Sequence, residues 1–200
     1  MKKKILILNY GTGNLNSISR TLKKFNCNID VDNTIRSINN AEIIILPGVG
    51  TFDKAISTLK EKKIINHIKK IAKKGKNILG ICLGMQLLCH ASEEINKTQG
   101  LKIISGFAKP IPKNHHIGWN SVHFNKSSIY SNLEKKEFYF QHRFHVQSNN
   151  SRDRGFFQIN KKKYLAFIKN KNILGVQFHP EKSQSAGLDF FKVYFDDIYG

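Results

Sequence analysis

Apolar residues follow two different patterns along the first half of the chain. The runs KILILN (4–9), AEIIIL (41–46) and NILGI (77–81) are apolar almost throughout, which is typical of strands buried on both faces. Between them, apolar residues recur every three or four positions. This spacing predicts a helix over 15–25 and one or two helices over 51–74.

After residue 100, short strand-like pieces alternate with turns, and a final helix is predicted from about 186 to 198. The strand-like pieces are GFAKPI, WNSVHF, EFYFQHRFHV, YLAFIK and NILGVQF. We therefore predict an α/β fold with a mostly parallel central sheet flanked by helices. The C-terminal half adds antiparallel strands, and one domain spans residues 1–200.

Length and composition limit the class of protein. The chain has 200 residues, of which 40% are hydrophobic, as in ordinary globular proteins. No apolar run approaches the roughly 20 residues that a membrane span needs, and the start MKKKILILNYG lacks the cleavage site of a signal peptide. Three cysteines without paired spacing argue for a reducing compartment. We expect a cytoplasmic protein that binds no membrane.

The net charge of +19 raises the question of nucleic-acid binding, since 33 Lys and Arg face only 14 Asp and Glu. The basic residues occur as scattered short runs, without an aromatic RNA-binding motif, zinc-finger spacing or helix-turn-helix pattern. A solvated lysine-rich surface is the favoured interpretation, and no nucleic-acid partner is expected. A basic nucleic-acid-binding or regulatory module with a degenerate site is the alternative from another class.

The stretch LGICLGMQLLCH (79–90) places Cys82 between a buried strand and a helix. Gly-x-Cys-x-Gly at such a turn is typical of a nucleophile elbow. Gly80 and Gly84 leave room for neighbouring backbone, and the helix N-terminus favours a thiolate. The N–H of Leu83 is free to face a developing oxyanion. The alternative is a buried, inert cysteine.

A thiol nucleophile needs a base and a group that orients the base. The segment ILGVQFHPEKSQ (173–184) places His179 and Glu181 at the end of an apolar strand, on the sheet edge where parallel folds locate their sites. Another strand ends at LPGVGTF (46–52), whose backbone suits a second oxyanion donor near Gly48–Gly50. A tight turn between strand and helix is the alternative for that loop.

These segments carry a family resemblance. PGVGTF, GICLGMQLL and GVQFHPEKSQ, in this order and spacing, resemble the class I (triad) glutamine amidotransferase domain. Within that class the chain is similar to the glutaminase subunits of imidazole glycerol phosphate synthase, through NYGTGN (9–14), PGVG, HIGWN (116–120) and HPEKSQ. The resemblance covers nearly the whole chain and implies a flavodoxin-like arrangement.

The resemblance implies catalytic roles. Cys82 would attack the carboxamide carbon of L-glutamine and form a thioester, His179 would transfer protons, and Glu181 would orient His179. It also implies a set of glutamine-binding and oxyanion residues. These are Gly48, Val49, Gly50, Leu83, Gln86, Glu94, His142 and Arg143, with Glu94 expected to hold the ammonium group.

The resemblance further implies a partner. Family members pass ammonia to a (β/α)8-barrel cyclase subunit, with which they form a heterodimer, and thereby supply imidazole glycerol phosphate synthesis in histidine biosynthesis. Trp119 and Lys182 match positions used at that interface. No metal and no organic cofactor are implied, and coupling between the two sites is expected.

Some positions depart from the family pattern. The family usually has a small residue where this chain has Arg143, close to the bound glutamine. Because the departures fall near the substrate rim and the partner-facing side, a related glutaminase is a second possibility, one that supplies ammonia for amidino or amino sugars of surface polysaccharides. A metal site made by the histidines between 115 and 145 is disfavoured, because no carboxylate or cysteine stands beside them at ligand spacing.

Overall fold

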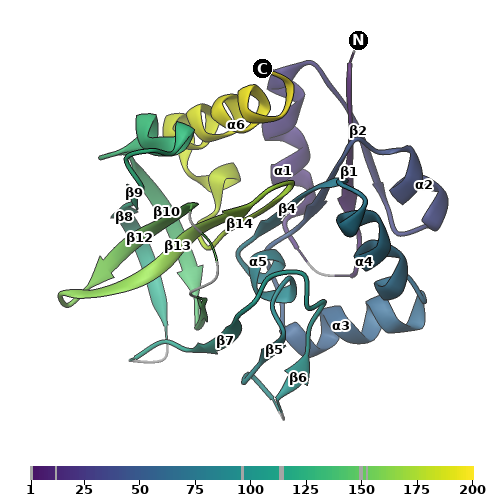
Figure 1. Cartoon of the computed structure of the whole chain (residues 1–200), viewed down its shortest axis with the longest axis horizontal. Coiled ribbons are helices and arrows are strands. Elements are labelled where there is room, and N and C mark those ends of the chain that lie inside the picture. The colour runs from purple at the N-terminus through teal and green to yellow at the C-terminus, as the bar shows by residue number, and fades with distance from the viewer. Residues whose placement is uncertain (1, 12, 96, 113–114, 149–150, 152) are drawn as a thin grey trace.

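The computed structural model describes residues 2–11, 13–95, 97–112, 115–148, 151 and 153–200; Thr12 of the NYGTGN motif lies outside them. An eight-stranded sheet crosses the molecule in the order β2-β1-β3-β4-β14-β13-β12-β9 (Figure 1). Its first five strands are parallel. They are β2 (Cys27–Asp32), β1 (Lys3–Leu8), β3 (Ile43–Leu46), β4 (Asn77–Ile81) and β14 (Ile173–Val176).

The other three strands of this sheet run antiparallel. They are β13 (Lys162–Asn170), β12 (Asp153–Ile159) and β9 (His123–Phe124). The predicted α/β class, with a mostly parallel sheet and antiparallel additions, is confirmed. One detail differs, because β14 comes from the C-terminal half yet pairs in parallel with β4.

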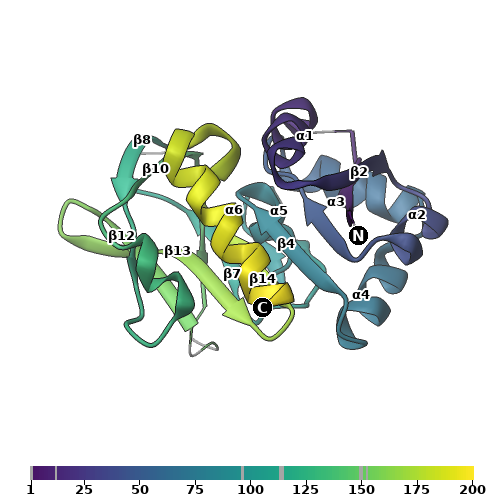
Figure 2. The same cartoon turned by 90° about the horizontal axis from the view of Figure 1, so that it is seen from above.

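Helices cover both faces of the sheet (Figure 2). Helices α1 (Leu15–Leu22) and α6 (Gln184–Tyr199) share one core cluster with the odd-numbered residues of β1 and β3. The opposite cluster contains the even-numbered residues of those strands together with the remaining helices. These are α2 (Ile35–Asn40), α3 (Phe52–Glu61), α4 (Ile65–Lys73) and α5 (Leu83–Leu87). Alternate side chains thus pack against different helical layers, which explains why the strands are apolar throughout.

Two smaller sheets flank the large one, the first beside its antiparallel strands and the second reaching towards α3 (Figure 1). One pairs β8 (His116–Ser121) with β10 (Glu137–His142). The other has the order β11-β7-β5-β6, and its strands are β11 (Phe144–Gln147), β7 (Phe107–Pro110), β5 (Ala91–Ser92) and β6 (Thr98–Gln99). Short 3-10 helices, η1 (Lys23–Phe25), η2 (Ile129–Leu133) and η3 (Pro180–Lys182), complete the elements of the described residues.

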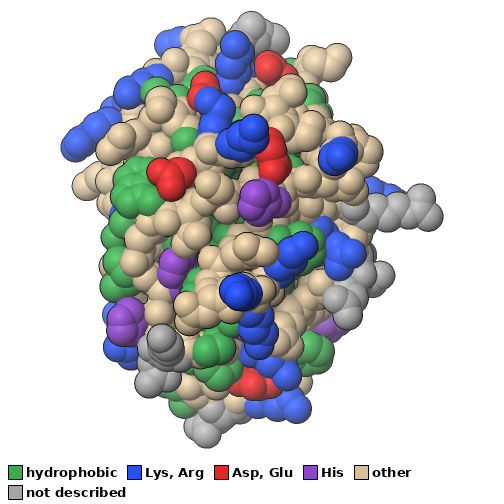
Figure 3. All heavy atoms as spheres, turned by 90° about the vertical axis from the view of Figure 1, so that its left-hand side faces the viewer, with side chains coloured by type: hydrophobic (Ala, Val, Ile, Leu, Met, Phe, Trp, Pro, Cys, Tyr) green, Lys and Arg blue, Asp and Glu red, His purple; other side chains and the backbone are tan. Residues whose placement is uncertain are grey.

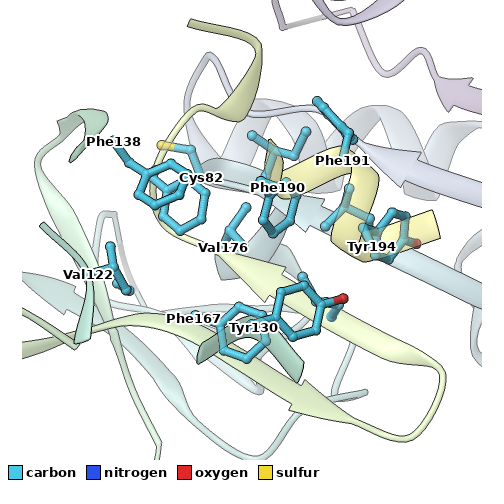
Figure 4. Close-up of a cluster of buried hydrophobic side chains, with 14 of the residues drawn as sticks. Cys82, Val122, Tyr130, Phe138, Phe167, Val176, Phe190, Phe191 and Tyr194 are labelled. Carbon is cyan, nitrogen blue, oxygen red and sulfur yellow. The ribbon is translucent and has the colours of Figure 1, made fainter. Parts of the chain in front are cut away.

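Aromatic packing joins the small β8–β10 sheet to the large one. Phe138 and Phe178 stack with centroids 4.2 Å apart, and Phe190 on α6 meets Phe178 edge-on at 5.4 Å. Figure 4 shows the sulfur of Cys82 at the margin of this buried cluster. Offset and edge-to-face aromatic pairs stabilise beyond their buried area. The aromatic cluster therefore forms a rigid wall beside Cys82.

The surface carries the high positive charge in separate groups. Figure 3 shows Lys and Arg side chains in several patches across one face, with Asp, Glu and uncharged side chains between them. None of the helices in the described part of the chain has the length and apolar character needed to cross a membrane.

Candidate active site

Cys82 occupies a strained turn between β4 and α5. Its backbone has φ 49° and ψ −102°, a conformation that costs free energy for a residue with a Cβ. The Cys82 N–H donates to the carbonyl of Val176 at 2.7 Å, which holds the turn against β14. Strain of this kind at the apex of a sharp strand-to-helix turn is typical of a nucleophile elbow.

Glycines on both sides of Cys82 allow the turn to close. A Cβ on Gly84 would overlap the carbonyl oxygen of Leu46, and a Cβ on Gly80 would lie 2.6 Å from the carbonyl oxygen of Gly84. The predicted close approach of neighbouring backbone is therefore present on both sides.

His179 and Glu181 come from the end of β14 and the 3-10 turn η3. The Nδ1 of His179 lies 2.9 Å from Oε1 of Glu181, and the two side chains are 1% and 0% exposed. Because carboxylate oxygen only accepts, Nδ1 donates and Nε2 is left for the thiol. The N–H of His179 also donates to the carbonyl of Tyr139 at 2.8 Å, which fixes the backbone.

The electrostatics of His179 show that the three side chains form one unit. Burial lowers the pKa of His179, but the charge of Cys82, a hydrogen bond with Cys82 and the adjacent Glu181 raise it more, to about 10. The imidazolium is thus stabilised from both sides, by the sulfur and by the carboxylate. The structure brings Cys82, His179 and Glu181 together in the predicted order.

Two further residues contact the sulfur and were not identified from the sequence. The side-chain amide of Gln177 donates to Sγ of Cys82 at 3.5 Å, and Sγ contacts the carbonyl oxygen of Gln141 at 3.7 Å. Gln177 is 0% exposed. It lies two residues before His179 and therefore on the same side of the extended chain. A polar residue two positions before His179, at the end of an apolar strand, was the sequence signal that could have identified Gln177.

The predicted oxyanion donors lie beside Cys82, with one of them engaged. The N–H of Leu83 donates to the carbonyl oxygen of Gly48 in a long hydrogen bond of 3.4 Å. A Cβ on Gly48 would lie 2.5 Å from the carbonyl oxygen of Ile81, so only glycine fits there. Val49 is 41% exposed, and both Val49 and Gly50 line the cleft above.

That cleft has a volume of about 590 Å³ and opens onto the sulfur. All eight predicted glutamine and oxyanion positions line it, together with Cys82 and His179. Buried Gln86 donates from Nε2 to the carbonyl of Phe144 at 2.9 Å. An Oε2 atom of Glu94 accepts from the N–H of Phe52 at 2.7 Å. Burial raises the pKa of Glu94.

His142 and Arg143 form another wall of the cleft. Nδ1 of His142 donates to the carbonyl of Phe144 at 2.9 Å, which fixes the ring. Burial, followed by the nearby His116, lowers the pKa of His142 to about 3, so the ring is neutral near pH 7. The side chain of Arg143 is exposed. Arg143 therefore lines the cleft without being fixed inside it.

Trp119 and Lys182 lie on the adjoining surface. Trp119 is 42% exposed and meets Tyr139 edge-on at 5.7 Å. Nζ of Lys182 lies 5.7 Å from the centre of the same Tyr139 ring and donates to Oε1 of Gln141 at 3.0 Å. Trp119 and Lys182 thus both pack against the ring of Tyr139. Over the described residues, no group of three His, Cys, Asp or Glu side chains is arranged to hold a metal ion.

Comparison with known proteins agrees with this arrangement. A sequence model of "Glutamine amidotransferase class-I" matches residues 6–195. "Imidazole glycerol phosphate synthase subunit HisH" from Lactococcus lactis is 34% identical over 201 residues, covering 98% of this chain and 100% of that protein. The subunit of that name from Caldanaerobacter subterraneus is 38% identical over 195 residues, covering 93% and 94%.

Solved structures are similar in fold. The structure of PurLQS from Thermotoga maritima superposes with a TM-score of 0.78 at 18% identity, covering 99% of this chain and 100% of that chain. A glutamine amidotransferase from Thermotoga maritima gives a TM-score of 0.65 at 17% identity, covering 98% and 85%. From the family match and the near-complete coverage of both relatives, the chain belongs to the class-I glutamine amidotransferases and, within them, to the imidazole glycerol phosphate synthase subunits HisH.

Proposed function

We propose that this chain hydrolyses L-glutamine to glutamate and ammonia, with Cys82, His179 and Glu181 as the catalytic residues. The observation that carries the proposal is the buried series of sulfur, imidazole and carboxylate at one end of a 590 Å³ cleft. A thiol, a base and a group that orients the base are the components that acyl transfer through cysteine requires.

The first half of the reaction forms a thioester. Nε2 of His179 holds the proton of the Cys82 thiol, as the raised pKa of the imidazole favours, and the thiolate attacks the carboxamide carbon. The electron pair of the C=O bond moves to oxygen, giving a tetrahedral oxyanion. The oxyanion then collapses, the C–N bond breaks, and the imidazolium of His179 protonates the leaving nitrogen to give ammonia. The γ-glutamyl group is left on sulfur.

The second half returns the enzyme to its starting state. His179 takes a proton from water, and the resulting hydroxide adds to the thioester carbon. Collapse of this second tetrahedral species breaks the C–S bond, releases glutamate and leaves the Cys82 thiolate beside the protonated His179. Glu181 stabilises the imidazolium in both halves, which its 2.9 Å contact with Nδ1 supports.

The oxyanion site requires a small rearrangement of the loop 48–50. The N–H of Leu83 donates to Gly48 at 3.4 Å, beyond the 2.7–3.2 Å of ordinary N–H···O bonds. An oxyanion, being charged, would compete well for this donor. Gly48 has no side chain to oppose rotation of its carbonyl. We place the substrate ammonium at Glu94 and assign the remaining walls to Gln86, His142 and Arg143.

We further propose that the ammonia passes to a (β/α)8-barrel cyclase subunit in a heterodimer that makes imidazole glycerol phosphate for histidine biosynthesis. The HisH subunits that resemble this chain over nearly their whole length support this assignment. The proposed contacts with that subunit are exposed Trp119 and half-buried Lys182, both of which contact Tyr139. Aromatic side chains are enriched in such interfaces.

The test is to follow glutamine hydrolysis by the purified chain alone and with the barrel cyclase. We expect little hydrolysis by the chain alone and much more with the partner and its ligand. Cys82→Ala should abolish turnover while leaving the heterodimer intact by size-exclusion chromatography. Turnover by Cys82→Ala would refute the catalytic assignment. Stimulation by the barrel partner of a polysaccharide pathway instead would refute the proposed acceptor.

A further inference from the structure

Tyr10 connects the N-terminal loop to the loop that contacts Cys82. It lies two residues after the end of β1, is 0% exposed, and donates its hydroxyl hydrogen to the carbonyl oxygen of Pro47, just after β3. Strands β1 and β3 are paired neighbours, so the phenol extends across the ends of two strands. The backbone N–H of Gly11 donates to the Asn9 side chain at 3.0 Å, which fixes the loop that carries Tyr10.

The acceptor of this hydrogen bond lies one peptide before the candidate oxyanion site. Pro47 is followed by Gly48, whose own carbonyl accepts the long 3.4 Å bond from Leu83. Two successive carbonyls of the loop are therefore held by different donors. The first is held by a buried phenol, and the second by a backbone N–H at a distance where hydrogen bonds are weak.

We infer that Tyr10 is a positioning residue for the oxyanion site. Its hydroxyl fixes the Pro47 carbonyl, so that rotation is confined to the Gly48 carbonyl when Leu83 turns its N–H to a substrate oxyanion. The inference rests on the proposed glutaminase function and adds a residue to it. A loop anchored on one side and free on the other can present a preorganised donor without collapsing onto the substrate.

A second contact also holds Pro47. A Cβ on Gly13 would lie 2.9 Å from Cβ of Pro47, so the N-terminal loop packs directly on the ring. Burial raises the pKa of Tyr10 well above its usual value, and the charge of Cys82 raises it further. The phenol therefore keeps its proton at working pH, remains a donor, and lies within electrostatic reach of the sulfur.

The test compares Tyr10→Phe with Tyr130→Phe. Tyr130 is equally buried and donates its hydroxyl hydrogen to Asp197 on α6 at 3.0 Å. Neither Tyr130 nor Asp197 lines the cleft at Cys82. Both variants lose one buried hydrogen bond. We expect Tyr10→Phe to lower kcat of partner-stimulated glutamine hydrolysis by about 10- to 100-fold, with KM within twofold. Tyr130→Phe should leave both constants within twofold.

Ligand affinities separate positioning from general destabilisation. Glutamate γ-semialdehyde adds the Cys82 thiol across its carbonyl, so that sulfur bonds to carbon and the thiol proton goes to the oxygen, which then lies where the oxyanion forms. Tyr10→Phe should weaken its affinity by the same factor as kcat. The affinity for glutamate, which forms no such adduct, should stay unchanged.

The possible outcomes contradict different parts of the proposal. Equal effects of Tyr10→Phe and Tyr130→Phe, or equal loss of affinity for both ligands, would overturn the inference. If wild type shows no glutaminase activity, the proposed function itself fails. If Tyr10→Phe does not fold, Gly13→Ala replaces it, because its added Cβ would press on Pro47. This variant should also lower kcat and the affinity for the semialdehyde, but not the affinity for glutamate. An unchanged kcat would overturn the inference.

Discussion

Glu181→Gln tests how much the buried carboxylate contributes to catalysis. The substitution keeps the size of the side chain and an oxygen that can accept from Nδ1 of His179. It removes the negative charge that lies 2.9 Å from the imidazole, in a side chain that is 0% exposed. The second carboxylate oxygen has no hydrogen-bond partner among the described residues, so an amide nitrogen placed there would be buried without an acceptor.

The magnitude follows from two limits. Two unit charges 2.9 Å apart interact by about 6 kcal/mol at an effective dielectric of about 20, which is an upper limit. A hydrogen bond to a charged group exceeds a neutral one by only about 1–2 kcal/mol. If the amide turns its nitrogen toward Nδ1 instead, His179 adopts the wrong tautomer, a defect worth up to about 10⁴ in rate. We expect kcat to fall at least about tenfold.

The assay is steady-state glutamine hydrolysis with the barrel partner at saturating glutamine, alongside thermal unfolding. Glu61→Gln, an exposed change on α3, is the matched control and should behave as wild type. Because the folded pKa of His179 is raised to about 10 from 6.5, its stabilising contribution is full below pH 6.5 and is lost as pH rises through 10. The stability deficit of Glu181→Gln should shrink over that window. A kcat within twofold of wild type would refute the reasoning.

Three further predictions concern the turn, the substrate and the partner. Gly187→Ala places a Cβ on the carbonyl oxygen of Pro180. It should destabilise the fold by about 1–3 kcal/mol, measured by thermal unfolding, and lower kcat by displacing Glu181. Ser185→Ala, at an exposed position, is the control, and an unchanged Tm of Gly187→Ala would contradict the packing. Glu94→Gln should raise KM for glutamine about tenfold or more with little change in kcat. Because burial raises the pKa of Glu94, KM of wild type should also rise as the pH falls towards that pKa. A KM that does not change as the pH is lowered would count against this role. Trp119→Ala should weaken heterodimer affinity by about 1 kcal/mol or more, measured by calorimetry, while unchanged affinity would remove Trp119 from the interface.

The strand-and-helix pattern predicted the parallel half of the fold well. NILGI corresponds to β4, and the helical spacing over 51–74 corresponds to α3 and α4. Both predictions worked because strands buried on two faces and amphipathic helices have unambiguous periodicity. Helix α2 (Ile35–Asn40) was not predicted, since it is six residues long and buries only Ile38. So short a segment shows less than two turns of pattern.

The candidate site was likewise predicted only in part from the sequence. The three motifs identified residues whose chemistry is visible in the side chain, such as Cys82 and His179. Contacts made through backbone carbonyls left no such signal. Gln141 contacts the sulfur through its backbone carbonyl oxygen. The proposed role of Tyr10 depends on its hydrogen bond to the carbonyl of Pro47, 37 positions away. Only the three-dimensional packing of β10 and of the N-terminal loop brings these groups to Cys82.

The central claim is that the sulfur of Cys82 carries the glutamyl group during turnover. It is tested most directly by acid-quenching the partner-stimulated chain during glutamine hydrolysis, digesting it, and locating the adduct by mass spectrometry. We expect a glutamyl thioester on the peptide containing Cys82, and no adduct at this position in Cys82→Ala. An adduct on Cys27 or Cys89 instead, or continued hydrolysis by Cys82→Ala, would contradict the account.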